Sequence, residues 1–144
     1  MKWGETKMKQ ITVTAAIIVN DNNELLICRR ADGSSMGGLW EFPGGKLEPG
    51  ETLEECIVRE CKEELSVDIS VIGIFKKTQY RYPDKLIDFT FFNAYIVNGC
   101  ICMNVHKEIK WIPVSEIRNY EFCPADAEIL DMLVGGCYGY MSIP

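Results

Sequence analysis

Three glutamates near the middle of the chain have a spacing that brings their carboxylates together on a helix. Glu60 and Glu64 are four residues apart, so a helix over 52–65 places them one turn apart on one face, with Glu63 beside them. The apolar stripe of the same helix continues this face toward its N-terminus. Acids that repel one another at the edge of an apolar stripe indicate a cleft rather than a solvated surface.

Carboxylate oxygens at this density suit a hard divalent cation, Mg²⁺ or Mn²⁺ as its substitute, which holds substrate phosphates. Arg59 is four residues before Glu63 and can pair with it, orienting a metal ligand, and Glu51 can act likewise. The residues Pro43-Gly44-Gly45 allow the main chain to approach the metal and add a carbonyl ligand. In isolation the charged pattern would more often be a solvated helix stabilised by ion pairs, and the longer string around it favours the metal site.

The elements expected around this helix are mostly strands, which together predict an α/β sandwich around a mixed sheet. A capping box of Thr52 and Glu55 starts the helix. Asn20–Asn23 is a turn that joins the first two strands into a hairpin, and Pro83-Asp84 is a second turn. The residues Pro43-Gly44-Gly45 end a short extended segment at 39–42. The expected strands cover 11–19, 24–29, 67–75, 77–81, 87–97 and 111–114, with a last helix over 125–133.

Length and composition exclude several classes of protein. The 144 residues predict a single domain, with a core over about 9–133, and a formal charge of −6 argues against a nucleic-acid partner. Seven cysteines without a C-x-x-C pair are expected to be reduced. The chain shows neither a signal peptide nor a membrane span, which predicts a cytoplasmic protein. We expect it to be a monomer or a homodimer. From Gly135 onward the sequence permits no structural prediction.

The string from Gly45 to Val67 resembles the Nudix box, G-x5-E-x7-R-E-U-x-E-E-x-G-U, in which U is a bulky aliphatic residue. Two positions depart from it: Cys61 stands at an aliphatic position, and Ser66 replaces the final glycine, so a different helix cap is expected. The resemblance, which extends over about residues 9–133, implies a Nudix-type α/β/α sandwich. The matching positions are Gly45, Glu51, Arg59, Glu60, Glu63, Glu64 and Val67.

Segments outside the box are similar to the MutT-like branch, whose members hydrolyse nucleoside triphosphates to a monophosphate and pyrophosphate. The resemblance implies that Glu60, Glu63, Glu64 and the carbonyl oxygen of Gly44 bind the metal, with Glu60 the leading candidate to activate water. It also implies that Arg30 meets the phosphates, and that Phe42 with its neighbours Glu41 and Pro43 lines the base pocket. The segments concerned are 29–30, 39–45, 82–84 and 122–126.

One position departs from the family in a way that affects the metal count. Family members often carry an acid six residues before the tryptophan that matches Trp111, and here that residue is Val105. Either Glu108 substitutes from a shifted loop, or the site uses fewer acids. The following residue, His106, is the only histidine and is expected to be structural rather than catalytic.

Asp126 permits two interpretations. In the resembling enzymes this position reads the base, and an ionised aspartate there would accept the amine of cytosine or the N1–H and amine of guanine. Equally, Asp126 is suited to cap the last helix.

The function predicted is a Mg²⁺-dependent pyrophosphohydrolase of nucleoside triphosphates that removes nucleotides such as 8-oxo-dGTP, CTP or dCTP from the pool. Water would attack a phosphorus of the triphosphate, and the resemblance implies the β-phosphorus. Two alternatives stay open: a diphosphatase for another nucleotide such as ADP-ribose, and a Nudix domain that senses a nucleotide without cleaving it.

Overall fold

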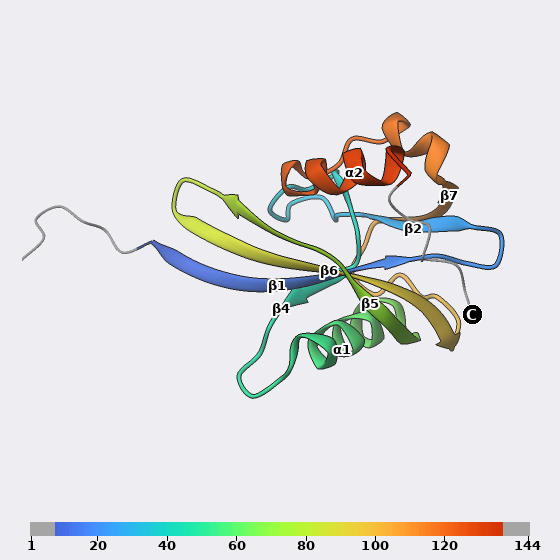
Figure 1. Ribbon diagram of the computed structural model, residues 1–144, viewed down its shortest axis with the longest axis horizontal. Helices are drawn as coiled ribbons and strands as arrows, with labels where there is room; N and C mark the ends of the chain where they lie inside the picture. Colours follow the sequence, from blue (N-terminus) through green and yellow to red (C-terminus); the bar gives the residue numbers. More distant parts are fainter. Residues whose placement is uncertain (1–7, 137–144) are drawn as a thin grey trace, which may run out of the picture.

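The computed structural model describes residues 8–136, which form two β-sheets, two α-helices and two short 3₁₀ segments (Figure 1). The first sheet has the strand order β4-β1-β6-β5 and is mixed, because β1 and β6 run parallel while the other neighbours are antiparallel. Its strands are β1 (Lys9–Ile18), β4 (Gly44–Lys46), β5 (Asp68–Arg81) and β6 (Lys85–Asn98).

The second sheet is antiparallel and has the order β3-β2-β7. Its strands are β2 (Glu24–Arg29), β3 (Trp40–Glu41) and β7 (Glu108–Pro113). The helices α1 (Leu53–Leu65) and α2 (Ala127–Val134) lie on opposite sides of the sheets, as Figure 1 shows. The 3₁₀ segments η1 (Val114–Asn119) and η2 (Pro124–Asp126) precede α2. The predicted α/β/α sandwich around a mixed sheet is therefore confirmed.

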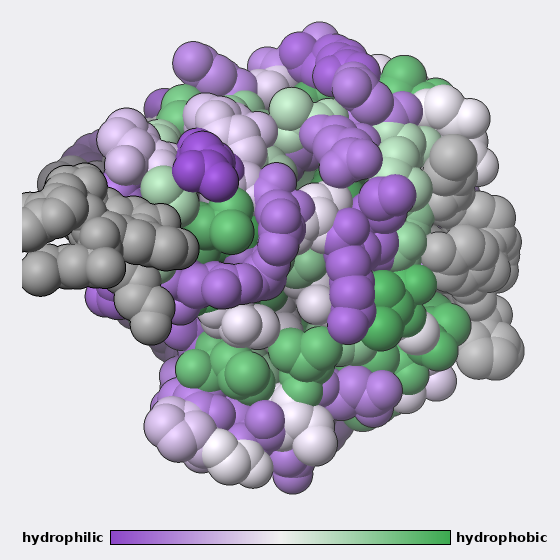
Figure 2. Space-filling model, turned by 60° about the vertical axis from the view of Figure 1, so that its left-hand side comes forward, coloured by the Kyte–Doolittle hydropathy of each residue, from purple (hydrophilic) through white to green (hydrophobic). Residues whose placement is uncertain are grey.

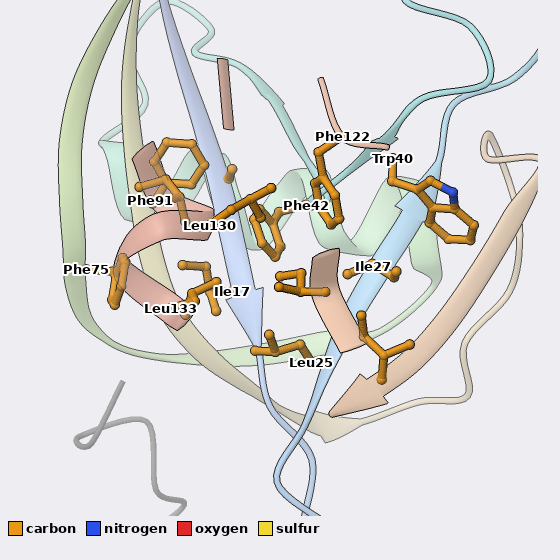
Figure 3. Close-up of a cluster of buried hydrophobic side chains, with 14 of the residues drawn as sticks. Ile17, Leu25, Ile27, Trp40, Phe42, Phe75, Phe91, Phe122, Leu130 and Leu133 are labelled. Atoms are coloured by element: carbon orange, nitrogen blue, oxygen red, sulfur yellow. The ribbon is translucent and has the colours of Figure 1, made fainter. Parts of the chain in front are cut away.

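Strand β1 is apolar along its second half because both of its faces are covered. Successive side chains of a strand point to opposite faces, so Ala15 and Ile17 pack on the α2 side while Ala16 and Ile18 pack on the α1 side. The α2 side is rich in aromatic rings, and Phe42 contacts both Phe91 and Phe122 there (Figure 3). The polar site is therefore built on a sheet that is fixed from two sides.

The predicted hairpin between the first two strands is present only at its turn. An antiparallel bridge between Val19 and Leu25 and a bond from the Asn20 N–H to the Glu24 carbonyl oxygen close the turn, but β1 and β2 then enter different sheets. β6 pairs along the whole of β1 on one edge, and β4 occupies part of the other edge at Val13–Ala15. Long-range partners thus displace the local pairing that the Asn-rich turn suggested.

Three further boundaries differ from those expected. The segments 67–75 and 77–81 form one continuous strand, β5, whose register shifts near Gly73 and Lys76 absorb the apparent break. The Gly44-Gly45 pair, expected to end an extended segment, itself forms β4 against β1. The last helix is preceded by a 3₁₀ turn over Pro124–Asp126, and proline is well tolerated at this first position because its missing N–H would have no partner there.

The surface is mixed in character. Hydrophilic side chains lie between apolar ones on the side shown in Figure 2. Within residues 8–136 no helix has the length and apolar character needed to cross a membrane. Six cysteines are free thiols in this part of the chain, and the seventh, Cys137, lies outside the described residues.

Candidate active site

Helix α1 is fixed at its first turn by the predicted capping box, which is confirmed. The Oγ1 of Thr52 accepts from the N–H of Glu55 at 3.1 Å, and the Thr52 N–H donates to the Glu55 carboxylate at 2.8 Å. These bonds satisfy two amide groups that have no partner inside the helix. The start of the acidic helix is thereby set by local sequence alone.

The other end of α1 uses the left-handed conformation that glycine would favour, so the expected change of cap is not observed. Ser66 has φ 61°, and its N–H donates to the carbonyl oxygen of Lys62 at 3.0 Å. Asn104 from the segment before β7 supports this end, because its amide donates to the Ser66 hydroxyl and to the carbonyl oxygen of Glu63, each at 2.9 Å. Hydrogen bonds from a distant loop thus stabilise the left-handed backbone conformation that a glycine would adopt without strain.

Each glycine of the Gly44-Gly45 pair allows a close contact of β4, Gly44 with β1 and Gly45 with α1. A side chain at Gly44 would overlap the Thr14 carbonyl oxygen of β1, and a side chain at Gly45 would overlap the carboxylate of Glu60. The Gly44 N–H donates to the Glu64 carboxylate at 3.1 Å. Glu60 and Glu64, one helical turn apart, therefore face the β4 main chain.

Arg59 is the centre of the charged network and pairs most closely with Glu51 rather than with Glu63. Its Nε and one terminal nitrogen hold the two Glu51 oxygens at 2.9 and 2.8 Å. The other terminal nitrogen contacts Glu60 at 2.8 Å and Glu63 at 3.2 Å. Hydrogen bonds from Arg59 lower the pKa of Glu51 to about 2. Arg59 thus orients the Glu60 carboxylate, and it also makes the contact with Glu63 that the sequence predicted.

The acids of α1 differ in environment. Burial, followed by the charge of Glu41, raises the pKa of Glu64 to about 8. Burial also raises the pKa of Glu60, against the opposing effect of Arg59. Glu63 is exposed, with 58% of its side chain accessible. Buried negative charge that exceeds its local positive partners is the condition under which a cation is bound most readily.

A cleft of about 500 Å³ opens beside this acidic end. Five predicted substrate residues line it: Arg30, Glu41, Phe42, Gly44 and Asp126. Pro43 is not among its walls, since its carbonyl oxygen accepts instead from the Ala16 N–H in the sheet. The remaining lining residues come from β1, the loop after β2, β4, the Tyr82–Lys85 turn, β6 and the chain before α2: Val13, Thr14, Ala15, Ser35, Met36, Gly45, Lys46, Tyr82, Pro83, Asp84, Lys85, Ile87, Phe89, Cys123 and Ala125.

Arg30 and Glu41 form an ion pair inside the cleft. A terminal nitrogen of Arg30 lies 2.9 Å from Glu41 Oε1, and the Arg30 Nε donates to the Ser35 carbonyl oxygen at 2.6 Å. The second oxygen of Glu41 lies 3.0 Å from Nε2 of His106, which is buried. The charges of Glu41 and Arg30 act on both Glu64 and Asp126, raising and lowering the pKa of each in turn.

Asp126 defines the inner end of the cleft and does not cap α2. It occupies the N-cap position, yet its side chain makes no capping hydrogen bond, and the residue is 5% exposed. Burial raises the pKa of Asp126 well above its ordinary value, and the charge of Glu41 acts in the same direction. The raised pKa widens the pH range over which this carboxyl is protonated, and a protonated carboxyl donates as well as accepts, whereas the sequence argument considered only the ionised form.

The donor set fits a hard divalent cation, although the three acids of α1 do not enclose a ready coordination sphere. No group of three or more Asp, Glu, Cys or His side chains in residues 8–136 is gathered to hold a metal. Glu63 is turned toward Arg59, while Glu60 and Glu64 already face the β4 main chain. Carboxylate and carbonyl oxygens would be the ligands, and Glu63 would join them by rotation about its own side chain.

The missing acid before β7 is not supplied by Glu108. That carboxylate lies 3.6 Å from Arg29 and 3.5 Å from Lys110, so it is paired along its own strands. Val105 is exposed in the segment before β7. Glu41, already in the cleft, is the additional acid whose charge reaches Glu64.

Several residues of the cleft were missed in the sequence. Ile87 and Phe89 line it from β6, and their alternation two residues apart is a signal that the sequence did carry. Ser35 and Met36 carried no such signal, because their loop reaches the cleft only through the tertiary fold. The pairing of His106 with Glu41, 65 residues earlier, likewise could not be predicted from the sequence.

A mixed sheet between two helices, with a Gly-Gly strand and a carboxylate helix beside one cleft, is the architecture of the Nudix class of hydrolases. Comparison with known proteins agrees, since the NUDIX domain model matches residues 8–133. The chain belongs to the Nudix family, and the identification made from its motif is confirmed.

The relatives found are of the MutT-like kind that the sequence indicated. The 8-oxo-dGTP diphosphatase of Escherichia coli K12 is 33% identical over 126 residues, covering 88% of this chain and 98% of the relative. The CTP pyrophosphohydrolase of the same organism is 33% identical over 124 residues, covering 86% and 91%. The solution structure of the E. coli ORF135 protein superposes with a TM-score of 0.76 at 32% identity, covering 89% of this chain and 91% of that chain.

Proposed function

We propose that this protein is a Mg²⁺-dependent pyrophosphohydrolase of nucleoside triphosphates that clears unwanted nucleotides from the pool. The observation that carries the proposal is a cleft lined by the Gly44-Gly45 strand, the Arg30–Glu41 pair and the buried Asp126. Glu60 and Glu64 of α1 do not line it themselves but lie against Gly44 and Gly45. Relatives named for 8-oxo-dGTP and for CTP cover nearly the same span of chain and support a triphosphate substrate.

The acidic end would carry the hydrolysis. A bound divalent cation supplies charge neutralisation of the phosphate oxygens and a lower pKa for the attacking water. Glu60, Glu63, Glu64 and the Gly44 carbonyl oxygen would hold it. Burial makes Glu60 a stronger base than an exposed carboxylate, so it is suited to accept the proton of the water. The new oxygen bond forms at the β-phosphorus, and the bridge to the α-phosphate breaks, releasing the monophosphate.

Arg30 would bind the phosphates from the side of the cleft. Its guanidinium is 31% exposed and keeps donors free beyond its bonds to Glu41 and Ser35. A planar guanidinium matches phosphate geometry better than an ammonium group does. Phe42, whose ring is packed against Phe91 and Phe122, would form an immobile wall of the base pocket.

Asp126 would read the base as a neutral acid. A protonated carboxyl matches an edge that places one acceptor beside one donor, such as N3 and the amine of cytosine. The oxidised edge of 8-oxoguanine offers O6 beside N7–H, whereas the corresponding edge of guanine offers two acceptors. Substrates of both relatives therefore fit the same group, and unmodified guanine in that orientation does not.

The test is pyrophosphate release from CTP, dCTP, 5-methyl-dCTP, dGTP, 8-oxo-dGTP and ADP-ribose, with and without Mg²⁺. We expect metal-dependent release with kcat/KM highest for a cytosine or oxidised-guanine nucleotide. Cleavage of ADP-ribose alone would replace the proposal with a diphosphatase of another nucleotide. Binding of a nucleotide without any turnover would replace it with a sensor.

A matched pair of variants tests the role of Asp126. Asp126→Asn keeps one donor and one acceptor, so it should retain the base preference, whereas Asp126→Ala should lose about 10- to 100-fold in kcat/KM for the preferred nucleotide. Because the pKa of Asp126 is raised, the neutral form is lost only as pH rises through that value, and KM should rise there. The asparagine variant should lack this rise. If Asp126 reads the base only when ionised, the asparagine variant should lose the base preference as fully as the alanine variant does.

A further inference from the structure

His106 contacts the site through one specific bond. Its side chain is 3% exposed, and Nε2 lies 3.0 Å from Glu41 Oε2. An ionised carboxylate only accepts, so Nε2 carries the hydrogen of this bond. In the described part of the chain Nδ1 has no hydrogen-bond partner, so the bond to Glu41 is the polar interaction that the ring makes there.

Glu41 transmits this contact to the cleft. Its two oxygens have separate partners, with His106 on Oε2 and Arg30 on Oε1 at 2.9 Å. A carboxylate held at only one oxygen can rotate, whereas one held at both presents a fixed acceptor to the guanidinium. Arg30 is held from its other side by the Ser35 carbonyl oxygen. The direction of the Arg30 donors is therefore set by a chain of two side chains behind it.

The segment that carries His106 is itself anchored at both ends. Before the histidine, the Cys102 N–H donates to the Leu65 carbonyl oxygen at 2.9 Å, and Asn104 bonds the last turn of α1. After it, the Lys107 N–H donates to the Arg29 carbonyl oxygen at 2.9 Å, next to Arg30 in sequence. The imidazole is thus placed by contacts both to the acidic helix and to the strand that leads into Arg30.

We propose that His106 is a positioning residue, which orients Glu41 and through it Arg30 toward the substrate phosphates. The inference rests on the proposed function in assigning Arg30 to the phosphates. It changes the expected role of the histidine from a purely structural one. Removing the bond frees Glu41 to rotate, so Arg30 is less well aligned before the substrate arrives.

Kinetics of a set of variants test the proposal. His106→Leu should reduce kcat/KM about tenfold, mainly through KM, because a hydrogen bond to a charged group is lost. His106→Gln places an amide donor near the position of Nε2 and should restore activity to within about threefold of the wild type. Lys107→Gln is the matched control, since it removes only an exposed ion pair with Asp32 and leaves the main-chain bond intact.

A double-variant cycle separates positioning from general loosening of the fold. In a Glu41→Ala background, His106→Leu should have no further effect, because the group through which it acts is gone. Equal effects of His106→Leu with and without Glu41 would overturn the proposal. So would a glutamine variant that folds normally and is as impaired as the leucine variant. Thermal unfolding of every variant identifies any that fail to fold.

A readout independent of turnover keeps this inference distinct from the proposed function. The Arg30 Nε–H resonance, assigned by its absence in Arg30→Lys, should be sharp and shifted in the wild type and in His106→Gln. In His106→Leu it should move toward the position of a solvent-exposed guanidinium. An unchanged resonance in His106→Leu would overturn the positioning role, whereas absence of triphosphate cleavage by the wild type would count only against the proposed function.

Discussion

The two ends of the cleft are built on different principles. At the acidic end, Gly44-Gly45 line the cleft from β4, and the glutamates that lie against this strand come with Arg59 from one helix just after it. Arg59 bonds Glu60 and Glu63 of that helix and Glu51 before it. At the inner end, Asp126, Tyr82 and Phe89 come from segments far apart, and Asp126 is buried with no capping bond. Chemistry that many substrates share can be fixed locally, whereas recognition of one base depends on distant segments that vary independently.

The largest expected effect lies at the acidic end. Glu64→Gln should fold normally, because the amide can still accept from the Gly44 N–H, yet turnover should fall on the order of a thousandfold through loss of a charged metal ligand. Steady-state kinetics and circular dichroism of the same sample measure both. Retained turnover would remove Glu64 from the metal site and weaken the contrast between the two ends.

The two glycines of β4 separate folding from catalysis. Gly45→Ala pushes on the movable Glu60 carboxylate, so the fold should persist while kcat falls about a hundredfold. Gly44→Ala pushes on the β1 main chain and should cost about 3 kcal/mol of unfolding free energy. Denaturant titration measures the unfolding free energy of each variant, and steady-state kinetics measure its kcat. If each variant loses both activity and stability, the separation of the catalytic role of Gly45 from the structural role of Gly44 is contradicted.

The pH dependence of stability without metal tests the buried charge of Glu64. Its pKa in the folded state is about 8, against 4.5 for the free group, so the folded protein keeps a proton that the unfolded chain loses. Stability should therefore fall as pH rises from about 4.5 to about 8, and Mg²⁺ should reverse the fall. Melting curves with chelator, with Mg²⁺ and for Glu64→Gln reveal this. A wild-type slope that persists unchanged in Glu64→Gln would assign the effect to another group.

The smallest effect is expected where α1 ends. Ser66→Gly relieves the left-handed backbone of a serine but loses the bond to Asn104, so we expect a gain of about 0.5 kcal/mol with unchanged kinetics. Chemical denaturation measures the gain. Loss of activity would mean that the Asn104 contact also holds the acids in place.

The sequence by itself determined the acidic end, the family and the layered fold. Thr52 with Glu55, the Gly-Gly pair and the spacing of the acids act over one or two helical turns, so their geometry follows from helix periodicity and steric limits. The alternation along β1, buried on both faces, follows from strand geometry in the same way.

Only the tertiary structure decided the rest. β1 pairs with β6 and β2 pairs with β7, so the predicted hairpin is limited to its turn, because pairing along whole strands outweighs a local turn. Asp126 makes no capping bond and its burial raises its pKa, and the fold brings His106 to Glu41 across 65 residues. Desolvation and pairing between distant segments depend on what surrounds a group in space, and neighbours in the chain do not specify that.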